Sequence, residues 1–153
     1  MTSLRFRNVD ASPSDDVRTW PYEAIVTAIE RGLVADWQPL FVEIRRSPWG
    51  TVARRVEHHV EQQLGRADGE GVGPDAVSTL FRLAIEAART AVVEQDRDEV
   101  ARRVGAAIER SGLTAAQFAE VAGTSASRLS TYATGRVTPS AAMLVRIERL
   151  AGS

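Results

Sequence analysis

The stretch LTAAQFAEVAGTSASRLSTYATG, residues 113–135, decides the fold because it contains two short helical segments separated by a glycine. Thr114 and Gln117 have the spacing of a capping box, in which a hydroxyl and an amide side chain satisfy free N–H groups at the start of a helix. Gly123 is a helix stop signal. The sequence therefore predicts a helix between Thr114 and Gly123, with an inward face formed by Phe118, Val121 and Ala122.

The second segment, TSASRLSTYATG, begins with two candidate N-caps, Thr124 and Ser125, and ends at Gly135. Its expected anchors in the core are Leu129 and Tyr132, and its other side chains are small, hydroxylated or cationic. A helix that enters the major groove of DNA, about 12 Å wide, needs such a slim face with hydrogen-bond donors and acceptors. This segment is therefore a candidate recognition helix.

Helical segments on both sides extend the pattern to four helices. VARRVGAAIERSG precedes the stretch and ends at Gly112, and RVTPSAAMLVRIERLA follows it, with Thr138 as N-cap and Pro139 at the first helical position. Two helices joined by a short glycine-containing turn form a helix-turn-helix unit. The last helix is expected to bury Met143, Leu144, Ile147 and Leu150.

The segment from Ser111 to Leu150 resembles the lambda-repressor-like, or XRE-type, helix-turn-helix regulators. Phe118 replaces the usual Leu, Ala115 stands where the family often has a phosphate-binding Gln, and Ala133 stands where it often has Glu. The resemblance implies a lambda-repressor-like domain over residues 96–153 that binds double-stranded DNA. The positions that carry it are Leu113, Thr114, Ala119, Gly123, Thr124, Ser125, Leu129, Ser130, Tyr132, Gly135, Arg136, Pro139 and Ser140.

The resemblance also implies roles for individual side chains. Phosphate contacts set the register of a protein on DNA, and base contacts set its sequence preference. Arg128 is a long forked donor that suits guanine O6 and N7. Base contacts are expected from Ser125, Ala126, Ser127, Arg128 and Thr131. Phosphate contacts are expected from the helix start near Thr114, and from Gln117, Arg136 and Thr138.

The rest of the chain indicates an N-terminal helical domain over residues 19–95, preceded by a flexible arm over residues 1–18. Pro21 suits a first helical position, Pro39 is tolerable only in a first helical turn, and Ser47 with Pro48 signals a third helix start. The four glycines and one proline of residues 65–74 predict a loop. Two apolar stripes are expected to face the core, the first formed by Ile25, Ile29 and Leu33 and the second by Val52, Val56, Val60 and Leu64.

A long connecting helix is predicted after this loop, with Val77, Ala84, Ala88 and Val92 among its apolar positions. The charged run EQDRDEV leaves two alternatives, a continuous helix or a break near Asp96. The apolar surface is wider than one core needs, so we expect it to pair two copies of the chain. A dimer on an inverted repeat places two recognition helices about 34 Å apart. The expected dimerisation residues are Leu80, Phe81 and Ile85.

Charge and composition narrow the function classes. Residues 1–96 hold eleven Arg and fifteen Asp or Glu, whereas residues 97–153 hold eight Arg and five Asp or Glu, so the C-terminal part is the basic one. The chain has no cysteine, which excludes disulfides and thiolate metal sites. No apolar run suits a membrane span or a signal peptide, so a cytoplasmic location is expected. No catalytic constellation is present, and neither enzymatic activity nor a cofactor is expected.

Two features of the N-terminal part leave alternatives. His58 and His59 are adjacent, so their side chains point about 100° apart on a helix and suit a solvated face better than one metal ion. Trp20, Trp37 and Trp49 indicate a small core or a groove for a protein partner. Together these patterns favour an all-α, sequence-specific transcriptional regulator, most simply a repressor. The alternative is an antitoxin that binds a protein partner through the N-terminal region and DNA through the C-terminal domain.

Overall fold

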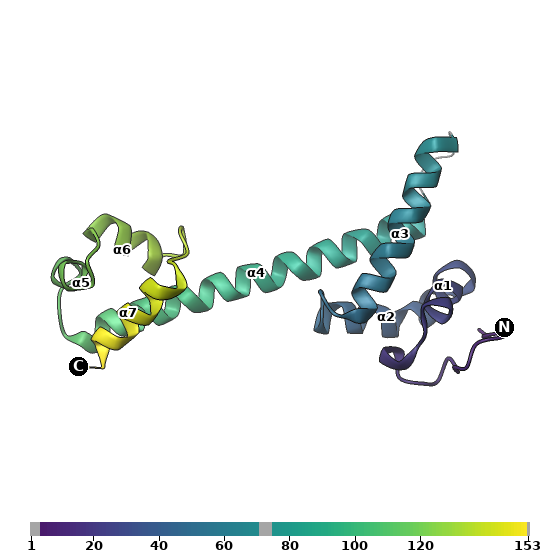
Figure 1. Ribbon diagram of the computed structural model, residues 1–153, viewed down its shortest axis with the longest axis horizontal. Coiled ribbons are helices and arrows are strands. Elements are labelled where there is room, and N and C mark those ends of the chain that lie inside the picture. The colour runs from purple at the N-terminus through teal and green to yellow at the C-terminus, as the bar shows by residue number, and fades with distance from the viewer. Residues whose placement is uncertain (1–3, 71–74, 153) are drawn as a thin grey trace. The chain divides into compact units, whose positions relative to one another are not determined.

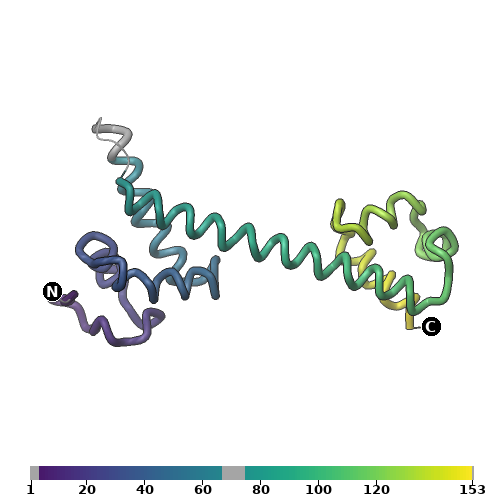
Figure 2. Tube along the Cα trace, turned by 180° about the vertical axis from the view of Figure 1, so that it is seen from behind, coloured from purple at the N-terminus to yellow at the C-terminus, as the bar shows by residue number. Residues whose placement is uncertain are grey.

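The computed structural model describes residues 4–70 and 75–152, and within them the chain is helical with no β-strand (Figures 1 and 2). The predicted all-α class is confirmed. The chain divides into two compact units, Met1–Ala91 and Val92–Ser153, whereas the sequence suggested a division between residues 95 and 96. The elements of the first unit are η1 (Val17–Thr19), α1 (Tyr22–Arg31), α2 (Val34–Arg46), α3 (Thr51–Glu70) and the beginning of α4 (Ala76–Ser111).

Aromatic side chains form the centre of the first unit. Phe81 of α4 stacks on Phe41 with ring centroids 4.6 Å apart, and it meets Trp37 edge to face at 5.9 Å. Phe81 and Ile85 are both buried in this core. The prediction that they form a dimer surface is therefore wrong, because their faces are covered by α2 and α3 of the same chain. Leu80, the third predicted dimerisation residue, is 46% exposed.

The predicted flexible arm is packed against the same core. Phe6 meets Trp20 edge to face at 5.0 Å, and the indole Nε1 of Trp20 donates to the carbonyl oxygen of Asp15 at 3.2 Å. The sequence did not predict these contacts, because an extended segment has no helical period. The partly buried residues that contact the core from this arm are Leu4, Phe6, Val9 and Ala11.

Helix starts in the first unit differ from the predicted ones by up to a turn. Pro21 is the N-cap of α1 rather than its first residue, and Leu33 lies beyond the end of that helix and is exposed. Pro39 is the sixth residue of α2 and lies past its first turn, so the expectation that this proline occupies a first helical turn was wrong. A proline there leaves one carbonyl without its helical donor. Residues 48–50 form a turn, and α3 begins only at Thr51.

The structure corrects part of the predicted Gly-rich loop and decides between a continuous helix and a break at Asp96. Residues 65–70 belong to α3, so that half of the loop assignment was wrong, and residues 71–74 lie outside the described part of the chain. The α4 helix is unbroken from Ala76 to Ser111 and includes Asp96. Exposed charged side chains of residues 94–99 are compatible with a helix whose surface there is solvated.

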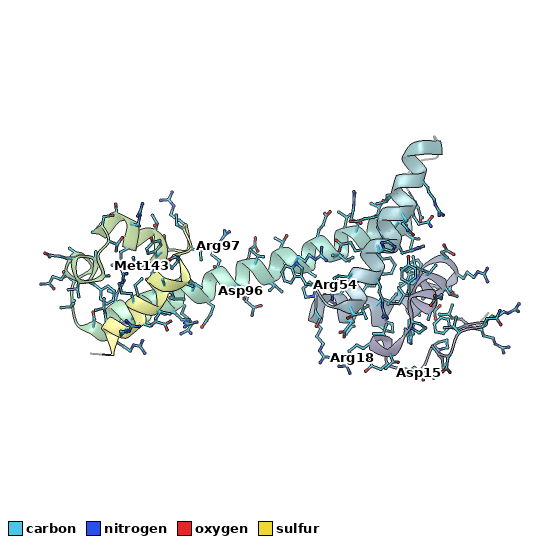
Figure 3. The ribbon with its side chains drawn as sticks, viewed as in Figure 1. Asp15, Arg18, Arg54, Asp96, Arg97 and Met143 are labelled. Carbon is cyan, nitrogen blue, oxygen red and sulfur yellow. The ribbon has the colours of Figure 1, made fainter. Side chains whose placement is uncertain are left out.

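The second unit contains the end of α4 and the helices α5 (Ala115–Ala122), α6 (Ala126–Ala133) and α7 (Ala141–Ala151). Within it α7 runs beside α4, where Arg103 Nε donates to Glu148 Oε1 at 2.6 Å (Figure 1). Met143 contacts the core of this unit (Figure 3). The side chains buried there are Val104, Ala107, Phe118, Ala119, Ala122, Leu129, Tyr132 and Ile147.

Two sequence predictions for the second unit need correction. Ser140, not Thr138, caps α7, because its Oγ accepts from the N–H of Met143 at 3.1 Å, and the helix begins after it. Val121 is 58% exposed, and Ala119 takes its expected place in the core. Both errors are small shifts along a helix that the sequence correctly located.

His59 is a buried polar side chain that the sequence assigned to a solvated face. It is 3% exposed, its Nε2 has no hydrogen-bond partner, and that atom lies 3.8 Å from Glu30 Oε1. Burial lowers the pKa of His59 below its usual value of 6.5, while the charges of Glu30 and Asp75 oppose this effect and those of Arg66 and His58 reinforce it. The folded first unit therefore favours the neutral imidazole.

We expect the stability of the chain to fall as pH drops below 6.5, because the unfolded chain then binds a proton that folded His59 resists. The free energy of unfolding should be lower at about pH 5.5 than at about pH 7.5. Replacing His59→Leu should flatten this pH dependence, whereas His58→Leu should retain most of it, because the burial that chiefly lowers the pKa of His59 is kept. Equal pH dependence in the His59→Leu variant and the original chain would contradict this explanation.

Candidate nucleic-acid interface

The candidate recognition helix α6 is attached to its unit by two side chains. Leu129 and Tyr132 are buried, and they lie three residues apart on one face of the helix. Ser127, Arg128 and Ser130 are exposed. The structure thus brings the small and cationic side chains together on the outward face, as predicted.

The start of α6 is fixed by Ser125, which the sequence identified as a candidate N-cap. Its Oγ accepts from the N–H of Arg128 at 3.1 Å and lies 3.3 Å from the Oγ of Ser127. Ala126, the first helical residue, is exposed. Thr131 is half-buried, and its hydroxyl donates to the carbonyl oxygen of Arg128 at 2.6 Å. Among the predicted base contacts, Arg128 is exposed and its guanidinium has no hydrogen bond within the described residues, so it is free to meet a base edge.

The first turn of α5 contains the predicted capping box. Thr114 Oγ1 accepts from the N–H of Gln117 at 3.2 Å, and Gln117 Oε1 accepts from the N–H of Thr114 at 3.0 Å. These bonds occupy both side-chain oxygens and leave the amide nitrogen of Gln117 as a donor. Ala115 and Ala116 follow the cap, and their first-turn N–H groups have no helical acceptor. Such amides at a helix start bind phosphate.

The turn between α5 and α6 sets the spacing of the two helices. Gly123 has a φ of 77°. The N–H of Thr124 donates to the carbonyl oxygen of Ala119 at 3.0 Å, and the N–H of Gly123 donates to the backbone carbonyl oxygen of Glu120 at 3.2 Å. This is a Schellman motif, which needs a residue with positive φ. Arg146 of α7 adds a bond from Nη1 to the carbonyl oxygen of Ala122 at 3.2 Å. Sequence reasoning missed Arg146, because no local pattern links it to the end of α5.

Charge in the second unit is distributed unevenly. Arg102 pairs with Glu99 and Arg103 pairs with Glu148, both at 2.6 Å. These pairs lower the pKa of Glu99 and of Glu148 through hydrogen bonds from the guanidinium groups. Among the described residues, Arg128 and Arg136 have no carboxylate partner. The positive charge is thus uncompensated at α6 and just beyond it.

Thr138 is a predicted phosphate contact that borders α4. It lines a hollow of about 230 Å³ with Asp96, Arg97, Val93 and Val100 of α4, and Figure 3 labels Asp96 and Arg97 on that helix. The hollow contains one carboxylate and one guanidinium, from Asp96 and Arg97, whose charges offset each other. Within the described residues, no three His, Asp or Glu side chains gather as a metal site.

Two glycines allow a matched test of the turn. Gly123→Ala should destabilise the chain by about 1–2 kcal/mol because a Cβ is strained at its positive φ. Gly105 lies within α4, and the position that a Cβ would take there has no neighbouring atom within 4 Å. Gly105→Ala should therefore stabilise the chain by about 0.5–1 kcal/mol. Denaturant unfolding of both variants measures these effects. Stabilisation by Gly123→Ala would contradict the assigned role of the turn.

Comparison with known proteins agrees with this geometry. Residues 99–152 match a family model described as a helix-turn-helix domain. Neither the curated proteins nor the solved structures gave a match. In the described part of the chain, no helix has the length and apolar character needed to cross a membrane. The C-terminal part of the chain is a helix-turn-helix domain, and such a domain suggests a DNA-binding regulator.

Proposed function

We propose that this chain is a sequence-specific DNA-binding transcriptional regulator that inserts α6 into the major groove. The observation that carries the proposal is the outward face of α6, which is slim, polar and exposed, with an unpaired Arg128 at its centre. A groove about 12 Å wide accepts a helix with such side chains. A regulator bound in this way at a promoter covers DNA that polymerase needs, so we infer repression as the direction of control.

Arg128 and Arg136 have different proposed roles. Arg128 lies on α6 and suits the O6 and N7 atoms of guanine, whereas Arg136 lies beyond the helix and suits a phosphate. The free amides of Ala115 and Ala116 hold a second phosphate. The helix-turn-helix domain therefore grips the backbone on both sides of the helix that contacts bases.

Binding measurements with the full chain should separate these roles. Affinity for duplex DNA should fall steeply between about 50 and 200 mM salt. Arg128→Ala should cost about 1–3 kcal/mol on the preferred site and relax the preference at one or two base positions. Arg136→Ala should weaken binding to all sequences about equally and reduce the salt dependence. Selection from randomised duplexes compares the two variants, and identical behaviour would mean that the roles are misassigned.

We further propose that two copies act together on an inverted repeat, because one recognition helix contacts too few base pairs to select a genomic site. Because Phe81 is buried, we propose that pairing uses an apolar groove of about 480 Å³ between α2 and α4. Small side chains on its floor permit close approach of a second helix. The groove is lined by Gln38, Phe41, Arg45, Leu80, Ala84, Ala87, Ala88 and Ala91.

Sedimentation of the full chain tests this surface. The chain should be a dimer at micromolar concentration, and Leu80→Glu should shift it towards monomer because a carboxylate in the groove would have to be desolvated. Leu33→Glu is the matched control, since Leu33 is exposed in the same unit but lies outside the groove. A monomeric original chain, or equal effects of the two variants, would remove the groove from this role.

The antitoxin alternative is favoured by one further observation. Trp49 is 50% exposed, with the Arg89 guanidinium 6.0 Å from its ring centroid. Exposed Trp and Arg are enriched in the energetically important centres of protein interfaces. If the first unit neutralises a protein partner, that protein should co-purify with the full chain and be lost from Trp49→Ala. Retention of operator binding in the same variant would show that the two functions are separate.

A further inference from the structure

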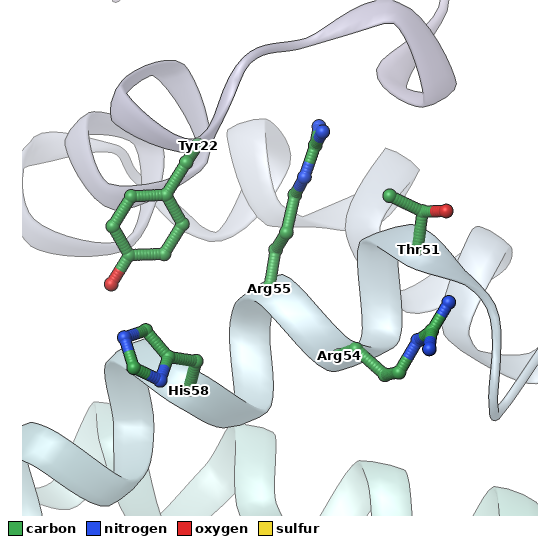
Figure 4. Close-up of a pocket in the computed structure, with 5 residues that line it drawn as sticks. All are labelled: Tyr22, Thr51, Arg54, Arg55 and His58. Atoms are coloured by element: carbon green, nitrogen blue, oxygen red, sulfur yellow. The ribbon is translucent and has the colours of Figure 1, made fainter.

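A basic pocket of about 420 Å³ lies on the first unit, outside the helix-turn-helix domain (Figure 4). Tyr22 contributes from the beginning of α1. The other lining residues come from α3, and their spacing of three, one and three residues places them on one face of that helix. They are Thr51, Arg54, Arg55 and His58.

The lining of this pocket contains donors and no carboxylate. Two arginines, two hydroxyl-bearing residues and a histidine line it, and the Arg54 and Arg55 side chains leave α3 in different directions (Figure 4), although the surrounding unit carries more acidic than basic residues. Among the described residues Arg54 has no ion pair. Arg55 Nη1 donates to the carbonyl oxygen of Trp20 at 2.7 Å, which positions the guanidinium without neutralising its charge. The pocket is therefore a preformed site of positive charge.

The backbone adds to this charge. Thr51 is the first residue of α3, and the carbonyl oxygen of Gly50 accepts from the N–H of Arg54 at 3.1 Å. The free N–H groups of this first turn carry the positive end of the helix dipole. At the other end of the pocket, the rings of Tyr22 and His58 lie 5.8 Å apart at an angle of 55°. The end near Thr51 and Arg54 is therefore complementary to an anionic group, and the end near Tyr22 and His58 is complementary to a planar ring.

We propose that this pocket binds the phosphate group of a nucleotide. Arginine forks suit both carboxylates and phosphates, but two guanidiniums with a hydroxyl and helix amides provide more donors than the two oxygens of a carboxylate can use. The aromatic wall formed by Tyr22 and His58 offers a face against which a base packs. The nucleotide is either free in solution or part of a DNA strand, and both sources present the same phosphate chemistry. This site does not depend on the function proposed for α6.

Calorimetric titration of the full chain with adenosine monophosphate, and separately with inorganic phosphate, tests the site in a phosphate-free buffer. Arg54→Gln should weaken binding of the nucleotide about tenfold or more, because it removes a charge-assisted hydrogen bond. Arg31→Gln is the matched control, since it removes an exposed arginine of the same unit outside the pocket. Inorganic phosphate should bind more weakly than the nucleotide and show the same dependence on Arg54.

The second arm of the experiment distinguishes the two sources. Arg54 is exposed and has no ion pair in the described structure, so circular dichroism of Arg54→Gln should show an unchanged fold. Nucleotide binding that depends on Arg54, with duplex affinity unchanged, assigns the site to a free nucleotide. Loss of duplex affinity in Arg54→Gln but not in Arg31→Gln, without nucleotide binding, assigns it to the DNA backbone. If neither ligand responds to Arg54→Gln in a folded protein, the proposal is wrong, whatever Arg128→Ala does to operator binding.

Discussion

The burial of Leu129 and Tyr132 is the constraint on which the arrangement of the second unit depends. A helix that is to enter a groove cannot be surrounded by its own protein, so few side chains can hold it. These two, packed among Phe118, Val104 and Ile147, fix α6 while the rest of its surface stays free. Truncating a buried Leu to Ala costs about 2–5 kcal/mol, a large share of the stability of an ordinary domain. The exposed face of α6 is therefore held in place by the packing of Leu129 and Tyr132 on its buried face.

The arginines can also be divided into those that pair with carboxylates within the fold and those that stay unpaired at the surface. Two arginines away from α6 are paired with carboxylates, Arg103 with Glu148 and Arg89 with Glu57, each at 2.6 Å. Arg128 and Arg136 keep their charge. An unpaired surface arginine contributes little to folding but attracts phosphate over a Debye length. The excess of eight arginines over five acidic residues in residues 97–153, more than the chain's net charge of −1, suits the surface proposed to meet DNA.

The sequence predicted the second unit well because its signals are local. Thr114, Gln117, Gly123 and Ser125 each act within one turn of chain, and the structure places each as a cap or a turn residue. Thr138 was misplaced because Ser140 offers an equivalent cap two residues later. The side-chain roles in DNA contact remain predictions, since they depend on a partner molecule rather than on the fold.

The first unit was harder because its decisive contacts connect distant residues. The stripe containing Phe81 and Ile85 looked too wide for one core, but Trp37 and Phe41 of α2 cover it, and periodicity alone cannot tell an internal partner from a second copy. His59 was misassigned for the same reason, since the helix that buries it lies elsewhere in the sequence. Pro39, Gly65 and Gly69 lie within helices although each disfavours a helix interior, because local propensity is only a weak guide to helix bounds.

The most direct test of the account is chemical probing of a bound DNA site with dimethyl sulfate, which methylates guanine N7 in the major groove and adenine N3 in the minor groove. The account predicts protection of guanine N7 at symmetric positions in two half-sites, and loss of one protected guanine per half-site when Arg128→Ala is bound. Protection confined to adenine N3, or a pattern that Arg128→Ala leaves unchanged, would contradict the claim that α6 contacts bases in the major groove.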